Sequence, residues 1–143
     1  MGRYVLRRDI AAPAAEVFKA FTDPKLAVDW LDAQAITDVD GPLDRAGSTY
    51  TLIIFWFHRL KVTVVRSEPP AIHETDHRGP LGSAHMTATL AERDGITHLE
   101  LVTEYSLPLG PIGRWIDRRW IDREPRTQAN REVDRLVAIV SAT

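Results

Sequence analysis

The sequence contains no cysteine, which excludes a disulfide framework and a thiolate metal site. Long apolar runs are also missing, because the longest, residues 52–57, is far shorter than the ~20 residues that cross a bilayer. A formal net charge of −2 gives no basic face for general nucleic-acid binding. The first ten residues, MGRYVLRRDI, lack the apolar segment of a signal peptide. We therefore expect a cytoplasmic protein with no membrane span and no nucleic-acid partner.

Glycine motifs for nucleotides and the G-x-S-x-G elbow are absent, so no cofactor is expected. One metal motif does match: HETDH, at residues 73–77, fits the H-E-x-x-H pattern of zinc proteases. That chemistry requires a helix, yet Pro69-Pro70 and Gly79-Pro80 leave too little room for one. In a strand, His73 and His77 would lie roughly 13 Å apart and could not share a zinc ion. The sequence therefore predicts no metal site.

The 143 residues are 44% hydrophobic and 27% charged, which predicts one domain, residues 1–143, with one core. Alternating apolar residues and turn signals predict one strand, two short helices and six further strands in a meander. The strands are expected at 3–11, 36–39, 49–56, 61–68, 72–78, 83–92 and 96–106. The short helices are expected from Pro13 up to Asp23 and at 25–31. Asp94-Gly95 is a typical two-residue hairpin turn.

Apolar residues recur at helical spacing from Pro111 to Val140 and predict a long last helix. Pro125 lies inside it and favours a kink or a break. A kink would let 112–121 and 129–140 pack on opposite ends of the sheet. Four residues would then lie near a cavity: Trp120, Arg123, Glu124 and Thr127. Alternatively, Pro125 occupies the first turn of a second helix, where it costs little.

The sheet needs one face covered, and only the last helix is long enough to cover it. We therefore predict an α+β fold in which an antiparallel sheet of six to seven strands curls around the C-terminal helix. The two short helices would close one end.

The stretch IAAPAAEVFKAFTDPKLAVDWL, Ile10 to Leu31, resembles the START/Bet v 1-like (SRPBCC) superfamily, in particular its polyketide cyclase/dehydrase-type branch. Three further stretches fall where that family has its glycine turn, its Pro-Pro strand end and its C-terminal helix. They are GPLDRAGSTYTL, VVRSEPPAI, and LPLGPIGRWIDRRW with REVDRLVAIV, in that order. The resemblance implies a helix-grip fold. It also implies a cavity between sheet and helix, where members bind lipids, sterols, hormones or polyketides. Only some members are enzymes, and no catalytic motif is shared among them.

We therefore expect the protein to bind a lipid-like or polycyclic hydrophobic molecule as a carrier or sensor, as a monomer or homodimer. The alternative is a polyketide cyclase/aromatase or a dehydratase-type enzyme. A third alternative is a protein-interaction module of the co-chaperone kind.

Strand alternation and broad aromatic area suggest which residues line the cavity, although each is also compatible with plain core packing. The candidate ligand-binding residues are Trp30, Tyr50, Leu52, Trp56, Met86, Leu101, Tyr105, Trp120 and Arg123.

The candidate catalytic residues are Glu74, Asp76 and Arg8. The strand at 72–78 places the two acids on one face and His73, Thr75 and His77 on the other, and either face could look inward. The favoured interpretation, however, is a peripheral strand that is wet on both sides. Acids and an arginine that converge in the cavity would favour catalysis, whereas an apolar lining would favour carriage.

Overall fold

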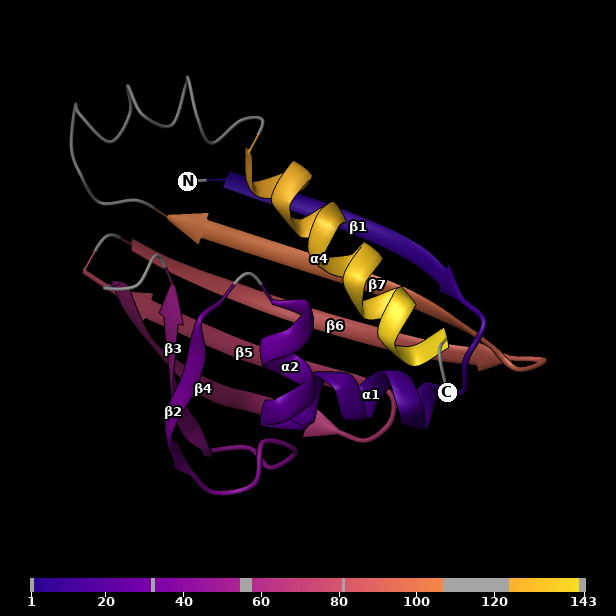
Figure 1. Ribbon diagram of the computed structural model, residues 1–143, viewed down its shortest axis with the longest axis horizontal. Coiled ribbons are helices and arrows are strands. Elements are labelled where there is room, and N and C mark those ends of the chain that lie inside the picture. Colours follow the sequence, from indigo (N-terminus) through magenta and orange to yellow (C-terminus); the bar gives the residue numbers. More distant parts are fainter. Residues whose placement is uncertain (1, 32, 55–57, 81, 107–123, 142–143) are drawn as a thin grey trace.

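The computed structural model describes residues 2–31, 33–54, 58–80, 82–106 and 124–141 (Figure 1). Seven antiparallel strands form one curved sheet, and the helices lie on one of its faces. The strands are β1 (Gly2–Ile10), β2 (Ala35–Asp40), β3 (Thr49–Ile54), β4 (His58–Glu68), β5 (Ile72–Gly79), β6 (Gly82–Arg93) and β7 (Ile96–Ser106). The helices are α1 (Ala14–Thr22), α2 (Pro24–Trp30) and α4 (Glu124–Ser141).

The strand order is β1-β7-β6-β5-β4-β3-β2, so the strands from β2 to β7 form a meander and β1 pairs with β7. The predicted hairpin turn joins β6 to β7, and both of its residues have positive φ, 55° at Asp94 and 78° at Gly95. These values are those that a type I′ turn requires, and asparagine, aspartate and glycine tolerate them best.

The two short helices are fixed at their ends by specific hydrogen bonds. The backbone N–H of Ala14 donates to Glu92 Oε1 of β6 at 2.6 Å, so a strand side chain caps the start of α1. Asp23 accepts from the backbone N–H of Lys25 at 3.0 Å and caps α2, whose first residue is Pro24. The backbone N–H groups of the first helical turn have no partner within the helix, and the two carboxylates supply acceptors for them.

α4 contacts β1, α1 and α2 (Figure 1). The guanidinium of Arg8 on β1 donates to Asp134 Oδ1 at 2.6 Å and to Asn130 Oδ1 at 3.1 Å. Arg135 donates to the backbone carbonyl of Trp30 at 3.1 Å. Val133, Leu136 and Val140 are buried. The predicted α+β arrangement, with a C-terminal helix packed on an antiparallel sheet, is thus confirmed.

Pro125 is the second residue of α4 and therefore lies in its first turn. The predicted helical segment 112–121, together with Trp120 and Arg123, lies outside the described residues. Thr127, also expected near the cavity, is exposed.

β5 is not the peripheral strand that its polar sequence suggested. β5 is the middle strand of seven, and His73 and Thr75 are buried. A strand whose inner face is half polar has the same sequence pattern as a strand exposed to solvent on both sides. Alternation alone therefore does not give the position of a strand in the sheet.

Most of the buried apolar residues fall into two clusters. The larger contains Leu6, Val17, Phe21, Leu101 and Leu136 and lies among α1, α2, α4 and the β1–β7–β6 part of the sheet. The smaller contains Leu43, Tyr50, Leu52 and Val62 on the β3–β4 side. β5 lies between these two parts of the sheet.

Candidate ligand-binding site on the inner face of the sheet

Strand register arranges the helix-facing side chains of the sheet, its inner face, in rows that cross the strands. We call two of these rows the His77 row and the Thr75 row. The His77 row contains Tyr50, Val62, His77, Ala84 and Tyr105. The Thr75 row contains Val64, Thr75, Met86, Thr103 and Tyr4.

The helices cover the inner face unevenly. In the next row, Ala88, Leu101 and Leu6 are all buried. By contrast, Ala84 and Met86 are only half-buried, although they lie on β6, which has a strand on each side. Part of the Met86 side chain packs against the larger cluster, and solvent reaches inner-face side chains of an internal strand only where their cover is incomplete. Among the described residues, the helices therefore leave part of the His77 and Thr75 rows uncovered.

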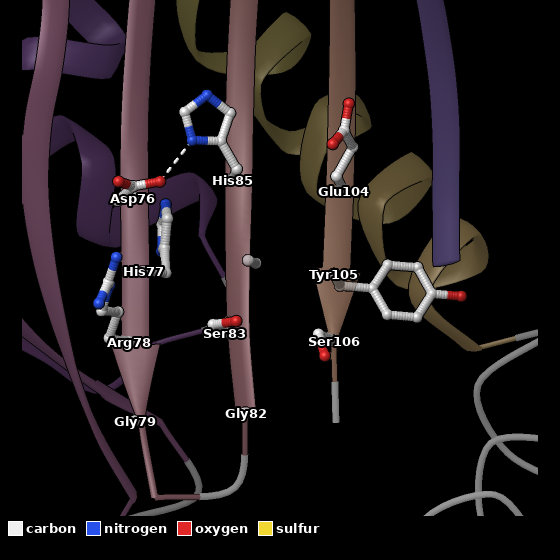
Figure 2. A pocket seen from close by; sticks show the side chains of 11 residues that line it. Asp76, His77, Arg78, Gly79, Gly82, Ser83, His85, Glu104, Tyr105 and Ser106 are labelled. Carbon is white, nitrogen blue, oxygen red and sulfur yellow. Dashed lines mark hydrogen bonds and ion pairs between the residues drawn. The ribbon is translucent and has the colours of Figure 1, made fainter. Parts of the chain in front are cut away.

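A pocket of about 490 Å³ lies at the ends of β5, β6 and β7. Its volume falls within the ~300–1,000 Å³ typical of small-molecule sites. Figure 2 shows the residues that line it, which include consecutive members of each strand and hence side chains of both faces. From the inner face come His77, Ala84 and Tyr105, and from the outer face come Asp76, Arg78, Ser83, His85, Glu104 and Ser106; Gly79 and Gly82 complete it.

His77 and Thr75 form the polar side of the inner face on β5. The hydroxyl of Thr75 lies 2.9 Å from His77 Nε2, within hydrogen-bond distance. Thr75 is 1% exposed, so its position is fixed by the surrounding core. Burial lowers the pKa of His77 to about 4, and the imidazole is neutral at pH 7.

Tyr4, Thr103 and Tyr105 form a second polar side, on β1 and β7. The rings of Tyr4 and Tyr105 have centroids 6.2 Å apart, and burial raises the pKa of Tyr4 although the side-chain hydrogen bond with Thr103 lowers it. Figure 2 shows the Tyr105 ring directed toward β1. A Cβ at Gly2 would overlap the Tyr105 ring at Cζ. Gly2 therefore leaves room for the Tyr105 ring over β1.

On the outer face, His85 lies between two carboxylates of β5. His85 Nε2 is 3.0 Å from Glu74 Oε2. His85 Nδ1 contacts Asp76 Oδ1 (Figure 2). The hydrogen bond to Asp76, followed by the charges of Asp76 and Glu74, raises the pKa of His85 against the opposing effect of burial. This arrangement stabilises an imidazolium that bridges β6 to β5.

The candidate catalytic residues do not converge. Glu74 and Asp76 lie on the outer face beside His85, whereas Arg8 lies on the inner face and is bound by Asp134 and Asn130 of α4. Their proposed catalytic role stays a prediction without support from their geometry. No group of acidic or histidine side chains in the described part of the chain is placed to hold a metal ion.

The candidate ligand-binding residues are divided between core and accessible surface. Trp30 and Leu101 are buried in the larger cluster, and Tyr50 and Leu52 in the smaller one. Met86 and Tyr105 are half-buried on the accessible rows. Trp56, Trp120 and Arg123 lie outside the described residues, and the ligand-binding role of the nine residues stays a prediction.

Sequence reasoning did not include Ala84 among the candidates, and it considered His77 only as one of the ionisable side chains of the strand at 72–78. Alternation does place His77 on the same strand face as Thr75. Their proximity to Ala84 and Tyr105, however, depends on register across three strands, which a single strand pattern does not determine.

Comparison with known proteins identifies the family. Residues 11–139 match the family described as "Activator of Hsp90 ATPase homolog 1-like protein", and the chain belongs to this family. The family lies within the START/Bet v 1-like SRPBCC superfamily, so the predicted superfamily is confirmed. This fold typically binds hydrophobic ligands. No curated protein matches the sequence.

Solved structures share the fold at low sequence identity. Protein MLL2253 from Mesorhizobium loti has a TM-score of 0.79 at 19% identity, covering 99% of this chain and 98% of that one. TTHA0849 from Thermus thermophilus has a TM-score of 0.78 at 16% identity, with the same coverage of 99% and 98%. DynU16, from the dynemicin biosynthetic locus, has a TM-score of 0.64 at 19% identity and covers 97% of this chain but 47% of that one. These similarities bear on the fold alone.

None of the helices within the described ranges is both long and apolar enough to span a membrane.

Proposed function

We propose that the protein binds a small hydrophobic molecule between the inner face of the sheet and the helices, as a carrier or sensor. The observation that carries this proposal is the exposure of inner-face side chains on an internal strand. Ala84 and Met86 lie on β6 between two strands, yet neither is buried. A bound ligand would cover this apolar floor, as the helices cover the neighbouring row of Ala88, Leu101 and Leu6.

The side chains of the two rows suit a ligand that is mainly apolar. Ala84 is the smallest side chain of its row, and it leaves space between the larger His77 and Tyr105. Gly82 adds no side chain to this space, whereas beside its pairing partner Gly79 the space is occupied by Leu60. The pocket that these residues border has the volume of a small-molecule site.

A cyclase or dehydratase is the alternative, and the observation in its favour is the imidazole of His77 beside the pocket. Proton transfer is most efficient when the pKa of the catalytic group lies near the working pH. The pKa of His77, lowered to about 4 by burial, makes it a weak base at pH 7. Binding therefore agrees better with this site than acid–base catalysis.

A fluorescence titration with N-phenyl-1-naphthylamine tests the proposal, because this uncharged probe emits strongly only in an apolar environment. We expect saturable binding of one probe per chain. Ala84→Phe, which places a ring between His77 and Tyr105, should weaken probe binding at least tenfold. The matched control is Thr89→Phe, on the same strand but with its exposed side chain on the outer face.

Absence of saturable binding, or equal affinity in the Ala84→Phe and wild-type proteins, would contradict the proposal. Circular dichroism would first confirm that both variants fold. Native mass spectrometry of the protein purified from its own host, followed by extraction, would then identify any bound compound. A conversion of the extracted compound by the purified protein would favour the enzymatic alternative.

A further inference from the structure

The inner face has two polar sides separated by an apolar floor. His77 and Thr75 lie on β5, Ala84 and Met86 on β6, and Tyr105 with Thr103 on β7. Strands are spaced about 4.8 Å apart, so the polar groups on β5 and β7 are separated by roughly 10 Å. This spacing places hydrogen-bonding groups at both ends of a flat apolar surface.

The two rows contain no aspartate, glutamate, lysine or arginine. Besides apolar residues, their members are threonine, tyrosine and histidine. Charged groups approach the pocket from the outer face instead, where Arg78 and His85 are accompanied by Asp76 and Glu104. Glu132 on α4 influences Tyr4 from the helix side. A ligand carboxylate on the inner face would therefore lose its hydration without a cation in either row to replace it.

His77 is the polar group best placed to meet a ligand on this floor. It is half-buried, borders the pocket and is adjacent to Ala84 across the β5–β6 pair. Thr75 contacts only one of its two ring nitrogens, Nε2. In the neutral ring the other nitrogen, Nδ1, is either a donor or an acceptor, depending on the tautomer that Thr75 stabilises.

We infer that this site recognises an uncharged aromatic or polycyclic ligand that carries a hydroxyl or carbonyl oxygen, with His77 as its hydrogen-bonding anchor and Thr75 as the positioning residue for that ring. The inference rests on the proposed function and adds the ligand's charge and its polar contact. It predicts selection among molecules that have the same apolar body.

Three probes with one scaffold test the inference: biphenyl, 4-phenylphenol and 4-phenylbenzoate. Each is used to displace N-phenyl-1-naphthylamine from the wild-type protein at pH 7. We expect 4-phenylphenol to compete about two- to twelvefold better than biphenyl, as one net hydrogen bond of about 0.5–1.5 kcal/mol implies. We expect 4-phenylbenzoate to compete less well than either.

The variants identify the anchor. His77→Leu should remove the preference for 4-phenylphenol over biphenyl, whereas His77→Gln, which retains donors and an acceptor, should keep part of it. Thr75→Val should reduce the preference without removing it, because the ring loses its orienting partner. The matched control is His98→Leu on the exposed outer face of β7, which should leave all three probes unaffected. Only the ratio between probes is compared, so a general change in affinity does not affect the result.

The outcomes separate the two proposals. If N-phenyl-1-naphthylamine does not bind, the proposed function fails and the inference fails with it. If it binds but 4-phenylbenzoate competes best, or the phenol preference persists in His77→Leu, the inference is overturned and the proposed function stands. If His77→Leu does not fold, the His77→Gln and Thr75→Val variants and the wild-type ranking of the probes still decide it.

Discussion

At the scale of single residues, Trp30 illustrates how an aromatic side chain can act between helices. Its indole N–H donates to the backbone carbonyl of Ala20 at 2.7 Å, near the end of α1. The ring meets Phe21 edge-on, with centroids 5.0 Å apart, and is 2% exposed. The last carbonyls of a helix lack partners within the helix, and Trp30 satisfies one of them. It thereby joins α2 to α1.

Trp30→Phe should therefore lower stability without altering probe binding. The phenyl ring keeps most of the packing but leaves the Ala20 carbonyl without its donor, at a cost of about 1–3 kcal/mol. Chemical denaturation would measure this change. Titration with N-phenyl-1-naphthylamine should give the wild-type affinity. A large loss of affinity in a folded Trp30→Phe protein would instead support the role in ligand binding that the sequence suggested.

At the scale of elements, β5 shows what one sequence can and cannot predict. The strand itself followed from alternation and from the flanking Pro69-Pro70 and Gly79-Pro80, and the observed element is Ile72–Gly79. The pairing of His73, Thr75 and His77 on one face also followed from the two-residue period. Which face turns inward depends on packing against Phe18 and Phe21 of α1, whose rings lie 5.6 Å and 6.3 Å from that of His73.

The other strands show the same division between what the sequence can predict and what it cannot. Meander order and the hairpin at Asp94-Gly95 depend on local turn chemistry and could be predicted. The candidate site depends instead on register across β5, β6 and β7, which brings Ala84 between His77 and Tyr105. No local pattern encodes the incomplete cover that the described helices give to Met86. Sequence reasoning therefore predicted the fold better than the site.

α4 supplies the prediction that belongs to this scale. Pro125 is the second residue of the helix, where its missing N–H would have no partner within the helix in any case. Pro125→Ala should thus change the free energy of unfolding by no more than about 1 kcal/mol. It should also leave the affinity for N-phenyl-1-naphthylamine unchanged.

Arg131→Pro is the contrasting variant, because Arg131 is exposed in the interior of α4. Proline there removes an internal hydrogen bond and should cost ~3 kcal/mol or more. Thermal unfolding distinguishes the two positions. A weaker affinity in Pro125→Ala, at unchanged stability, would indicate that the start of α4 shapes the site.

At the scale of the whole molecule, three histidines couple stability to pH in opposite directions. Burial lowers the pKa of both His73 and His77 from 6.5 to about 4. The unfolded chain therefore binds protons between pH 6.5 and 4 that the native protein does not bind, so stability falls as pH decreases through this window. His85 has a raised pKa, mainly through its hydrogen bond to Asp76. Its contribution is complete below pH 6.5 and is lost as pH rises through the raised value.

We therefore expect the free energy of unfolding to decrease from pH 6.5 toward pH 5, before most carboxylates begin to titrate. His73 is 2% exposed. At pH values near 4 and below, its lowered pKa would reduce the free energy of unfolding by about 3 kcal/mol, because each pKa unit corresponds to 1.36 kcal/mol. Urea denaturation at half-unit pH steps measures the slope. His73→Phe, which keeps an aromatic ring beside Phe18, should flatten it. A slope that His73→Phe leaves unchanged would show that burial of this imidazole does not set the acid sensitivity of the fold.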